Sequence, residues 1–315
     1  YRRSGRTGSC SDTVHRGSVM HTLGIDIGGT FIKYAWVNSA YEIVKEWEVE
    51  TKLQTSSELF YDYLIESAGD LSSVDIIGVS APGVLASDST VTSIAAPNVA
   101  IMYNTNVNKE VMKRANKQCY TMNDAKAAGY CELKLGAARN TGSSMVFIIG
   151  TGIGGALTLG DHVLEGIDGY AGEFSRIPMK NSKGEFSIAA HEASASTLPF
   201  MYNQLHPDSV TSAKDVFTLF HQGDADAITV MNQWVDNIVF ILCILISIYN
   251  PDVICIGGGV TKDPGLIDHI NTVFDGLGRE MLFAQPALTT KLVACEYSSN
   301  SNLMGAVLFA LESTK

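Results

Sequence analysis

Two stretches of this sequence repeat one local pattern: an apolar, strand-like run, a glycine-rich turn and a second strand-like run. The first comprises Thr22–Ile27, Gly28-Gly29-Thr30 and Ile32–Asn38, and the second comprises Ser144–Ile149, Gly150-Thr151-Gly152 and Gly155–Leu159. Glycine permits the tight turns and close backbone approach that bring N–H groups to phosphate oxygens. A strand that returns as a hairpin differs from the strand–loop–helix unit of Rossmann and Walker-type sites. The repeat therefore predicts an α/β fold of two duplicated domains with a cleft between them.

The remaining segments fit this plan. Further strands are predicted at Glu42–Thr51, Asp75–Ser80, Cys119–Met122 and Asp252–Ile256, and helices at Ser56–Glu66, Val107–Lys117, within Glu192–Asn250 and at Asn302–Glu312. We expect residues 20–124 to form the first domain and residues 125–301 the second. The C-terminal helix, about residues 302–315, is expected to pack back on the first domain.

The first 19 residues differ in composition from the rest of the chain. They are rich in Ser, Gly and Arg and are followed by Met20. We interpret residues 1–19 as a tag or a disordered leader, and Met20 as the native start.

Composition narrows the function. A formal charge of −11 over 315 residues disfavours a nucleic-acid partner, which would need a basic face. The six cysteines form no CxxC pair, which is typical of reduced thiols in a cytoplasmic protein. The longest apolar run, Ile238–Tyr249, is shorter than the ~20 residues of a membrane-spanning helix. It predicts a buried helix and no membrane partner.

The dipeptide Asn123-Asp124 lies between the two glycine-rich turns and ends a short strand-like run. A carboxylate between two phosphate-binding loops can deprotonate a hydroxyl as it attacks the terminal phosphate of a nucleotide. The alternative is structural, because Asp is a favoured N-cap and would cap a helix that starts at Ala125. We interpret Asp124 as the general base of a phosphotransferase.

Further short motifs follow one another along the chain: Asp26–Thr30, Ala81-Pro82-Gly83, Pro97-Asn98, Asn123-Asp124-Ala125, Gly150–Gly155, Ala171-Gly172-Glu173, Glu192–Ser196, Ile256–Val260 and Gly305-Ala306. In this order and spacing, they resemble the ROK family (repressors, open reading frames, kinases) from Thr22 to Leu311. That family includes bacterial glucokinases, fructokinases and N-acetylmannosamine kinases. The resemblance implies an actin-like ATPase (ribonuclease H-like) fold and ATP-dependent phosphorylation of a sugar hydroxyl.

The resemblance implies an ATP site formed by Asp26, Gly28, Gly29, Thr30, Lys33, Gly150, Thr151, Gly152, Gly257, Gly258 and Gly259. The two glycine-rich turns would hold the phosphates, unless they are ordinary hairpin turns. Asp26 would hold Mg²⁺ through water, unless it only forms an ion pair with Lys33. The three glycines from Gly257 would let adenine and ribose lie against the backbone, unless they are a flexible strand-to-helix connection.

The sugar site implied by the resemblance comprises Gly83, Asn98, Asn123, Asp124, Glu173 and Glu192. Amides and carboxylates suit this task because they donate to and accept from neighbouring hydroxyls. For Glu173 the alternative is a carboxylate at a helix start or on the surface. The irregular stretch Gly169–Gly172 before it favours a loop of the site.

The chain departs from the ROK pattern at the zinc motif. The histidine that usually follows the Gly-Glu pair is replaced by Arg176, and Lys183–Glu192 contains none of the usual cysteines. Structural zinc needs four N or S ligands, and His191 alone does not supply them. We therefore predict no zinc site, an Ile177–Ile188 loop ordered by packing or by bound sugar, and room for a bulkier substrate.

Together these inferences predict a cytoplasmic, homodimeric enzyme that uses ATP and Mg²⁺ to phosphorylate the 6-hydroxyl of a hexose, such as glucose, N-acetylmannosamine or a glucoside. The main alternative is a non-catalytic sugar sensor or regulator of the ROK type. Such regulators resemble this chain with a helix-turn-helix module added, for which the residues before Thr22 are too few. A polyol kinase is a second alternative, disfavoured by Glu173 and Glu192.

Overall fold

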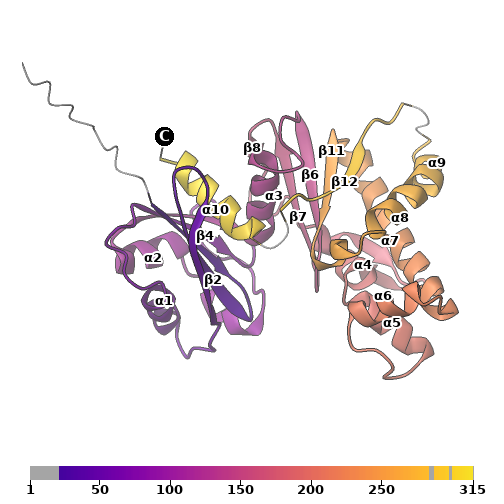
Figure 1. Cartoon of the computed structure of the whole chain (residues 1–315), viewed down its shortest axis with the longest axis horizontal. Coiled ribbons are helices and arrows are strands. Elements are labelled where there is room, and N and C mark those ends of the chain that lie inside the picture. Colours follow the sequence, from indigo (N-terminus) through magenta and orange to yellow (C-terminus); the bar gives the residue numbers. More distant parts are fainter. Residues whose placement is uncertain (1–20, 284–286, 298–299, 315) are drawn as a thin grey trace, which may run out of the picture.

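The computed structural model describes residues 21–283, 287–297 and 300–314. It contains two five-stranded sheets that stand apart, with helices α3 (Asp124–Lys134) and α10 (Ser301–Glu312) between them (Figure 1). The predicted leader, residues 1–19, lies outside the described residues.

The two sheets repeat one topology. In spatial order, the first contains β3 (Ile43–Glu50), β2 (Phe31–Val37), β1 (Thr22–Ile27), β4 (Ile76–Ala81) and β5 (Gln118–Asn123), and the second contains β8 (His162–Val163), β7 (Ile153–Leu159), β6 (Ser143–Ile149), β11 (Val253–Gly257) and β12 (Lys291–Ala294). In each sheet three antiparallel strands lead into two parallel ones. The predicted duplication is therefore confirmed.

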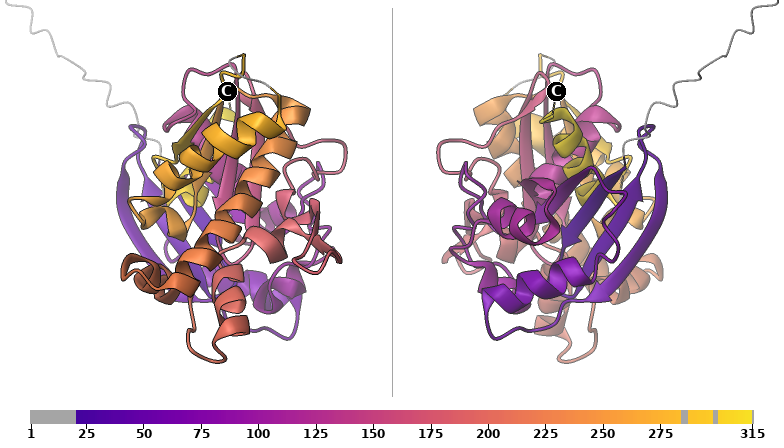
Figure 2. Two further views of the ribbon diagram at one scale, coloured as in Figure 1. Left: turned by 90° about the vertical axis from the view of Figure 1, so that its right-hand side faces the viewer. Right: turned by 90° about the vertical axis from the view of Figure 1, so that its left-hand side faces the viewer.

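Helices cover the outer faces of the sheets. Figure 2 shows α1 (Ser57–Glu66) and α2 (Val107–Ala115) at the end formed by the first sheet, and the later helices at the other end. The second group comprises α4 (Ala189–Ala193), α5 (Thr197–Leu205), α6 (Ala213–His221), α7 (Ala225–Tyr249), α8 (Leu266–Val273) and α9 (Arg279–Met281). Short 3-10 turns are η1 (Pro97–Met102), η2 (Phe174–Arg176) and η3 (Gly259–Lys262), and η4 (Phe274–Gly278) is a π-helical turn.

Local chemistry sets several helix ends. Ser56, Asn106 and Asp224 precede α1, α2 and α7, and each side chain accepts a hydrogen bond from the first turn of its helix. Helix α2 ends two residues before the predicted Lys117, because Asn116 adopts a left-handed conformation with φ of 52°.

Helix α7 is the central helix of the second core. It has 25 residues, so it is much longer than the predicted run, and by length and composition alone it could cross a membrane. Its apolar side chains, among them Trp234, Ile238 and Leu242, are instead fully buried in the core beside β6 and β11. This environment is that of a core helix.

Helices α3 and α10 cross closely between the two sheets. A Cβ at Gly305 would lie 1.7 Å from the Ala127 carbonyl oxygen, and a Cβ at Gly78 would lie 2.4 Å from that of Ala306. On its other side α3 packs against β7, where a Cβ at Gly129 would overlap Ala156. Small residues thus let α10 contact both α3 and the first sheet.

Candidate active site

The junction of β5 and α3 carries the predicted base. Asn123 is the N-cap of α3, because its Oδ1 accepts from the Lys126 N–H, and its Nδ2 donates to the Gly83 carbonyl at 2.9 Å. Asp124 is the first helical residue, so the alternative in which Asp124 caps a helix starting at Ala125 is wrong. The cap leaves Asp124 at the positive end of the helix, facing the space between the two sheets.

The Asp124 carboxylate is influenced by two other carboxylates, those of Asp26 and Glu173. Its Oδ1 accepts from the Ala125 N–H at 2.7 Å and from Asn123 Nδ2 at 3.0 Å. Burial, opposed by the Ala125 hydrogen bond and reinforced by the charges of Asp26 and Glu173, raises the pKa of Asp124 to about 6. A carboxylate with this pKa is ionised at neutral pH and still basic enough to take a proton in a reaction.

Asp26 is the second-last residue of β1, the central strand of the first sheet. Ser80 Oγ donates to its Oδ1 at 2.7 Å, and Lys33 lies opposite it in the β1–β2 pairing. Burial raises the pKa of Asp26, while hydrogen bonds from Ser80 and Asn302 and the charge of Lys33 oppose this rise. No group of three or more His, Cys, Asp or Glu side chains gathers around a common point in the described ranges. A single partly buried carboxylate ligand fits Mg²⁺ that keeps several waters and is also held by substrate phosphates.

Hydrogen bonds from Ala195 and Ser196 hold the second glycine-rich turn in place. The Gly150 carbonyl accepts from the Ala195 N–H at 2.8 Å, and the Thr151 carbonyl accepts from Ser196 Oγ at 3.0 Å. These two bonds fix the turn by its carbonyl groups. Thr151 itself is exposed.

A cavity of about 360 Å³ lies between the two halves of the molecule. Its walls bring together seven of the predicted site residues, namely Gly83, Asn123, Asp124, Gly150, Thr151, Gly152 and Glu173. Arg176 also lines it. Burial raises the pKa of Glu173, and the charges of Lys126 and Arg176 oppose that rise.

The first glycine-rich turn does not line this cavity. Its Gly28 N–H donates to the Phe31 carbonyl, and Asn98 Nδ2 donates to the Gly29 carbonyl at 3.2 Å and the Thr51 carbonyl at 3.3 Å. The Asn98 amide group therefore secures the turn and lies outside the Asp124 cavity.

Glu192 is placed in a neighbouring cavity of about 850 Å³, bounded by α5, α7 and residues 180–192. There its carboxylate accepts from Ser187 Oγ. Thr151 lines both cavities, so they adjoin at the second glycine-rich turn. His191 also lines this second cavity.

The segment in which we predicted no zinc site forms a hairpin. Strands β9 (Pro178–Lys180) and β10 (Phe186–Ile188) pair antiparallel, and the Asn181 side chain accepts from the Lys183 and Glu185 N–H groups in the turn. Met179 is buried in the second core. Packing and backbone pairing thus order the segment, one of the two predicted possibilities.

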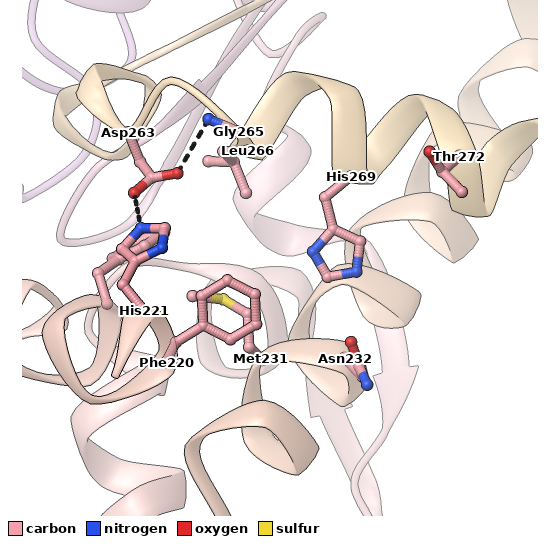
Figure 3. Close-up of a pocket in the computed structure, with 10 residues that line it drawn as sticks. Phe220, His221, Met231, Asn232, Asp263, Gly265, Leu266, His269 and Thr272 are labelled. Carbon is pink, nitrogen blue, oxygen red and sulfur yellow. Dashed lines mark hydrogen bonds and ion pairs between the residues drawn. The ribbon is translucent and has the colours of Figure 1, made fainter. Parts of the chain in front are cut away.

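The last three predicted nucleotide residues, Gly257, Gly258 and Gly259, lie at the end of β11. Gly258 has φ of 103°, and a Cβ there would lie 2.1 Å from the Ile149 carbonyl oxygen. Beyond η3, Asp263 accepts from the Gly265 N–H and contacts His221 Nε2 at the edge of a third cavity of about 290 Å³ (Figure 3). This cavity lies between α6, α7 and α8.

The sequence analysis missed three residues of the site. Ser80 holds Asp26, Asn302 from α10 lines the Asp124 cavity, and Lys126 is buried behind Glu173. Only Lys126 carried a signal, because it is a lysine within the small-residue run Ala125–Ala128. The other two are brought to the site by sheet pairing and by the returning C-terminal helix.

Known proteins resemble this chain along most of its length. A glucokinase from Halalkalibacterium halodurans is 29% identical over 271 residues, which cover 76% of this chain and 80% of that protein. A ROK family glucokinase from Streptomyces griseus, solved with glucose and AMPPNP, superposes with a TM-score of 0.76 at 23% identity, over 93% of this chain and 99% of that one.

A ROK family protein from Streptococcus pneumoniae, solved with sucrose, has a TM-score of 0.82 at 20% identity, over 94% of this chain and 99% of that one. These structural likenesses show the actin-like ATPase fold of ROK proteins. The ROK family model matches residues 22–313, and the chain therefore belongs to the ROK family.

Proposed function

We propose that this ROK protein is an ATP-dependent sugar kinase that phosphorylates the 6-hydroxyl of a hexose. The observation that carries the proposal is the Asp124 carboxylate, which lies in the cavity between the two halves with a pKa raised to about 6, next to the second glycine-rich turn. Relatives that are glucokinases support the same reaction class.

In the proposed reaction Asp124 accepts the proton of the sugar hydroxyl as its oxygen attacks the γ-phosphorus of ATP. A new P–O bond forms to the sugar, the bond from the γ-phosphorus to the bridging oxygen breaks, and ADP leaves with that electron pair. The Gly28 and Gly150 N–H groups already donate within their turns, so the other N–H groups of the two glycine-rich turns would hold the phosphates, with Lys33. Gly257–Gly259 would lie along the nucleoside.

Asp26 would hold the hydrated Mg²⁺ that accompanies ATP. When bound, the ion neutralises phosphate charge. Ser80 and Asn302 orient the Asp26 carboxylate for that task through their hydrogen bonds. We propose no structural zinc in this protein.

The proposed sugar-binding groups are Gly83, Asn98, Asn123, Asp124, Glu173 and Glu192. Glu173 is supported by its position in the Asp124 cavity. Asn98 and Glu192 lie outside that cavity, so their contact with a sugar would require the two halves to close around it. The adjoining cavity of about 850 Å³ supports a substrate larger than glucose, such as an N-acetyl sugar or a glucoside.

We further propose a cytoplasmic homodimer with a domain boundary between Asp124 and Ala125. Symmetric dimers are the commonest oligomers of soluble proteins. Light scattering on the purified protein tests the dimer.

The function is tested by coupled measurement of ADP release with ATP and Mg²⁺ across glucose, fructose, mannose, N-acetylmannosamine, N-acetylglucosamine and a β-glucoside. We expect sugar-dependent ADP release that disappears in Asp124→Asn. Sugar binding without turnover of any sugar would instead identify a non-catalytic sensor or regulator, the alternative function.

A further inference from the structure

Lys126 is a buried cation that the proposed chemistry does not use. It lies on the first turn of α3, two residues after Asp124, with 2% of its surface exposed. Its Nζ donates a hydrogen bond to the Gly169 carbonyl oxygen. Burial lowers the pKa of Lys126, while the charges of Glu165 and Glu173 oppose that change. Burying an ammonium group costs free energy, so we expect a functional reason for its position beside the cavity.

The hydrogen bond from Lys126 holds the backbone segment that leads to Glu173. At Gly169, which has φ of 72°, a Cβ would lie 1.9 Å from the Leu85 carbonyl oxygen of the first half. At Gly172, with φ of 88°, a Cβ would lie 2.9 Å from the Gly155 carbonyl oxygen on β7. The segment is thus fixed between the two halves, and Lys126 reaches it from the helix between them.

We propose that Lys126 is a positioning residue for Glu173, because it anchors the Gly169 carbonyl in the segment that leads to Glu173 and, together with Arg176, supplies positive charge to the surroundings of the Glu173 carboxylate. This inference rests on the proposed function, in which Glu173 binds hydroxyls of the sugar. Lys126 itself does not line the Asp124 cavity and acts through the segment that it holds.

The direct test compares Lys126→Met, which removes the donor and the charge at similar length, with Lys134→Met as the matched control. Lys134 lies on the same helix, but its ammonium pairs with Asp161 and Glu312. We expect Lys126→Met to raise the KM for the sugar about tenfold, as expected for losing a hydrogen bond from a charged group. The KM for ATP should stay unchanged, as should both constants in the control.

The pH dependence separates positioning from a general loss of stability. The charged groups that face Glu173 are Lys126 and Asp124 from α3 and Arg176 from η2. Removing the Lys126 cation removes an influence that lowers the pKa of Glu173. The rise of the sugar KM on acidification should therefore begin at a higher pH in Lys126→Met than in the wild type. Lys126→Gln, which keeps a donor without charge, should show the same pH shift with a smaller rise in KM.

A double-variant cycle with Glu173→Gln completes the test. If Lys126 acts through Glu173, Lys126→Met should weaken sugar binding, measured by calorimetry, in the wild-type background and hardly at all in Glu173→Gln. Equal losses in both backgrounds would overturn the proposal, and so would wild-type sugar affinity in Lys126→Met. Absence of sugar-dependent ADP release by the wild type would reject the kinase function separately, because calorimetry follows binding alone.

Discussion

At the residue scale, the environment of Asp124 determines the chemistry that we propose. Its carboxylate is partly buried and accepts two hydrogen bonds, and with the charges of Asp26 and Glu173 this environment raises its pKa to about 6. Because the base must be ionised to accept a proton, kcat/KM should rise with pH through about 6 and level off above it. A pH–rate profile with the preferred sugar measures this.

Asp124→Asn should lower kcat by about 10²–10⁴, the usual contribution of general base catalysis. The same substitution lowers kcat but should leave the free energy of unfolding at pH 7 unchanged or raise it. A carboxyl group whose pKa is raised on folding stabilises the native state when protonated, and loses that contribution as pH rises through about 6. The variant should therefore unfold at the same or a higher temperature at pH 7. A lower melting temperature with normal kcat would contradict both expectations.

Gly258 tests the geometry at the end of β11. Its φ of 103° is accessible only to glycine at low cost, and a Cβ would lie 2.1 Å from the Ile149 carbonyl oxygen. Gly258→Ala should therefore lower the free energy of unfolding by more than ~2 kcal/mol in urea denaturation. Gly259→Ala is the matched control, because no atom lies within 4 Å of a Cβ built there. Similar losses in both variants would show that the strand end is not constrained as described.

Sequence reasoning at this scale located Asp124 and the glycine turns but missed the side chains behind them. Asn123, not Asp124, caps α3, since either residue type can cap and only the backbone geometry decides. Ser80 and Asn302 are ordinary polar residues in sequence, and their roles arise from strand pairing and from the return of α10.

At the element scale, the regular strands and helices followed from apolar periodicity and caps. Strand β1 spans the predicted residues, and α1 begins directly after its predicted cap, Ser56. The short elements β8, β9, β10 and β12 were not predicted, because strands of two to four residues carry too little pattern. Their pairing with neighbouring strands creates them.

The β9–β10 hairpin is ordered by contacts of the protein itself, which leads to a direct prediction. Backbone pairing, the Asn181 turn and burial of Met179 hold the hairpin. We therefore expect the purified protein to contain no stoichiometric zinc by elemental analysis, and its melting temperature to be unchanged by a strong chelator. About one zinc per chain, or a marked loss of stability on chelation, would disprove the prediction.

At the scale of the whole molecule, the two halves meet at α3, α10 and the segment before α10. Glu132 of α3 is fully buried, and its carboxylate accepts from the backbone N–H groups of Ala137, Glu296 and Tyr297. These hydrogen bonds form a second connection between the halves, from α3 to the segment through which the chain returns to the first half. Apart from the contact between Gly169 and Leu85, these connections lie at α3 and α10, which would be the axis of a rotation of the two halves.

This arrangement predicts closure on ligand binding. The first glycine-rich turn, Asn98 and Glu192 lie outside the Asp124 cavity. The proposed function nevertheless requires all of them to contact one bound sugar and one bound ATP. Rotation of the halves about α3 and α10 would bring them together and exclude water, which otherwise competes for the phosphoryl group.

Small-angle scattering should therefore show the radius of gyration of the protein falling when sugar and a non-hydrolysable ATP analogue are both present. Sugar alone should produce part of the change, since Asp124 and Glu173 already face one cavity. An unchanged radius with both ligands bound, verified by calorimetry, would mean that the open geometry is itself the binding form. Asn98 and Glu192 would then have no part in sugar recognition.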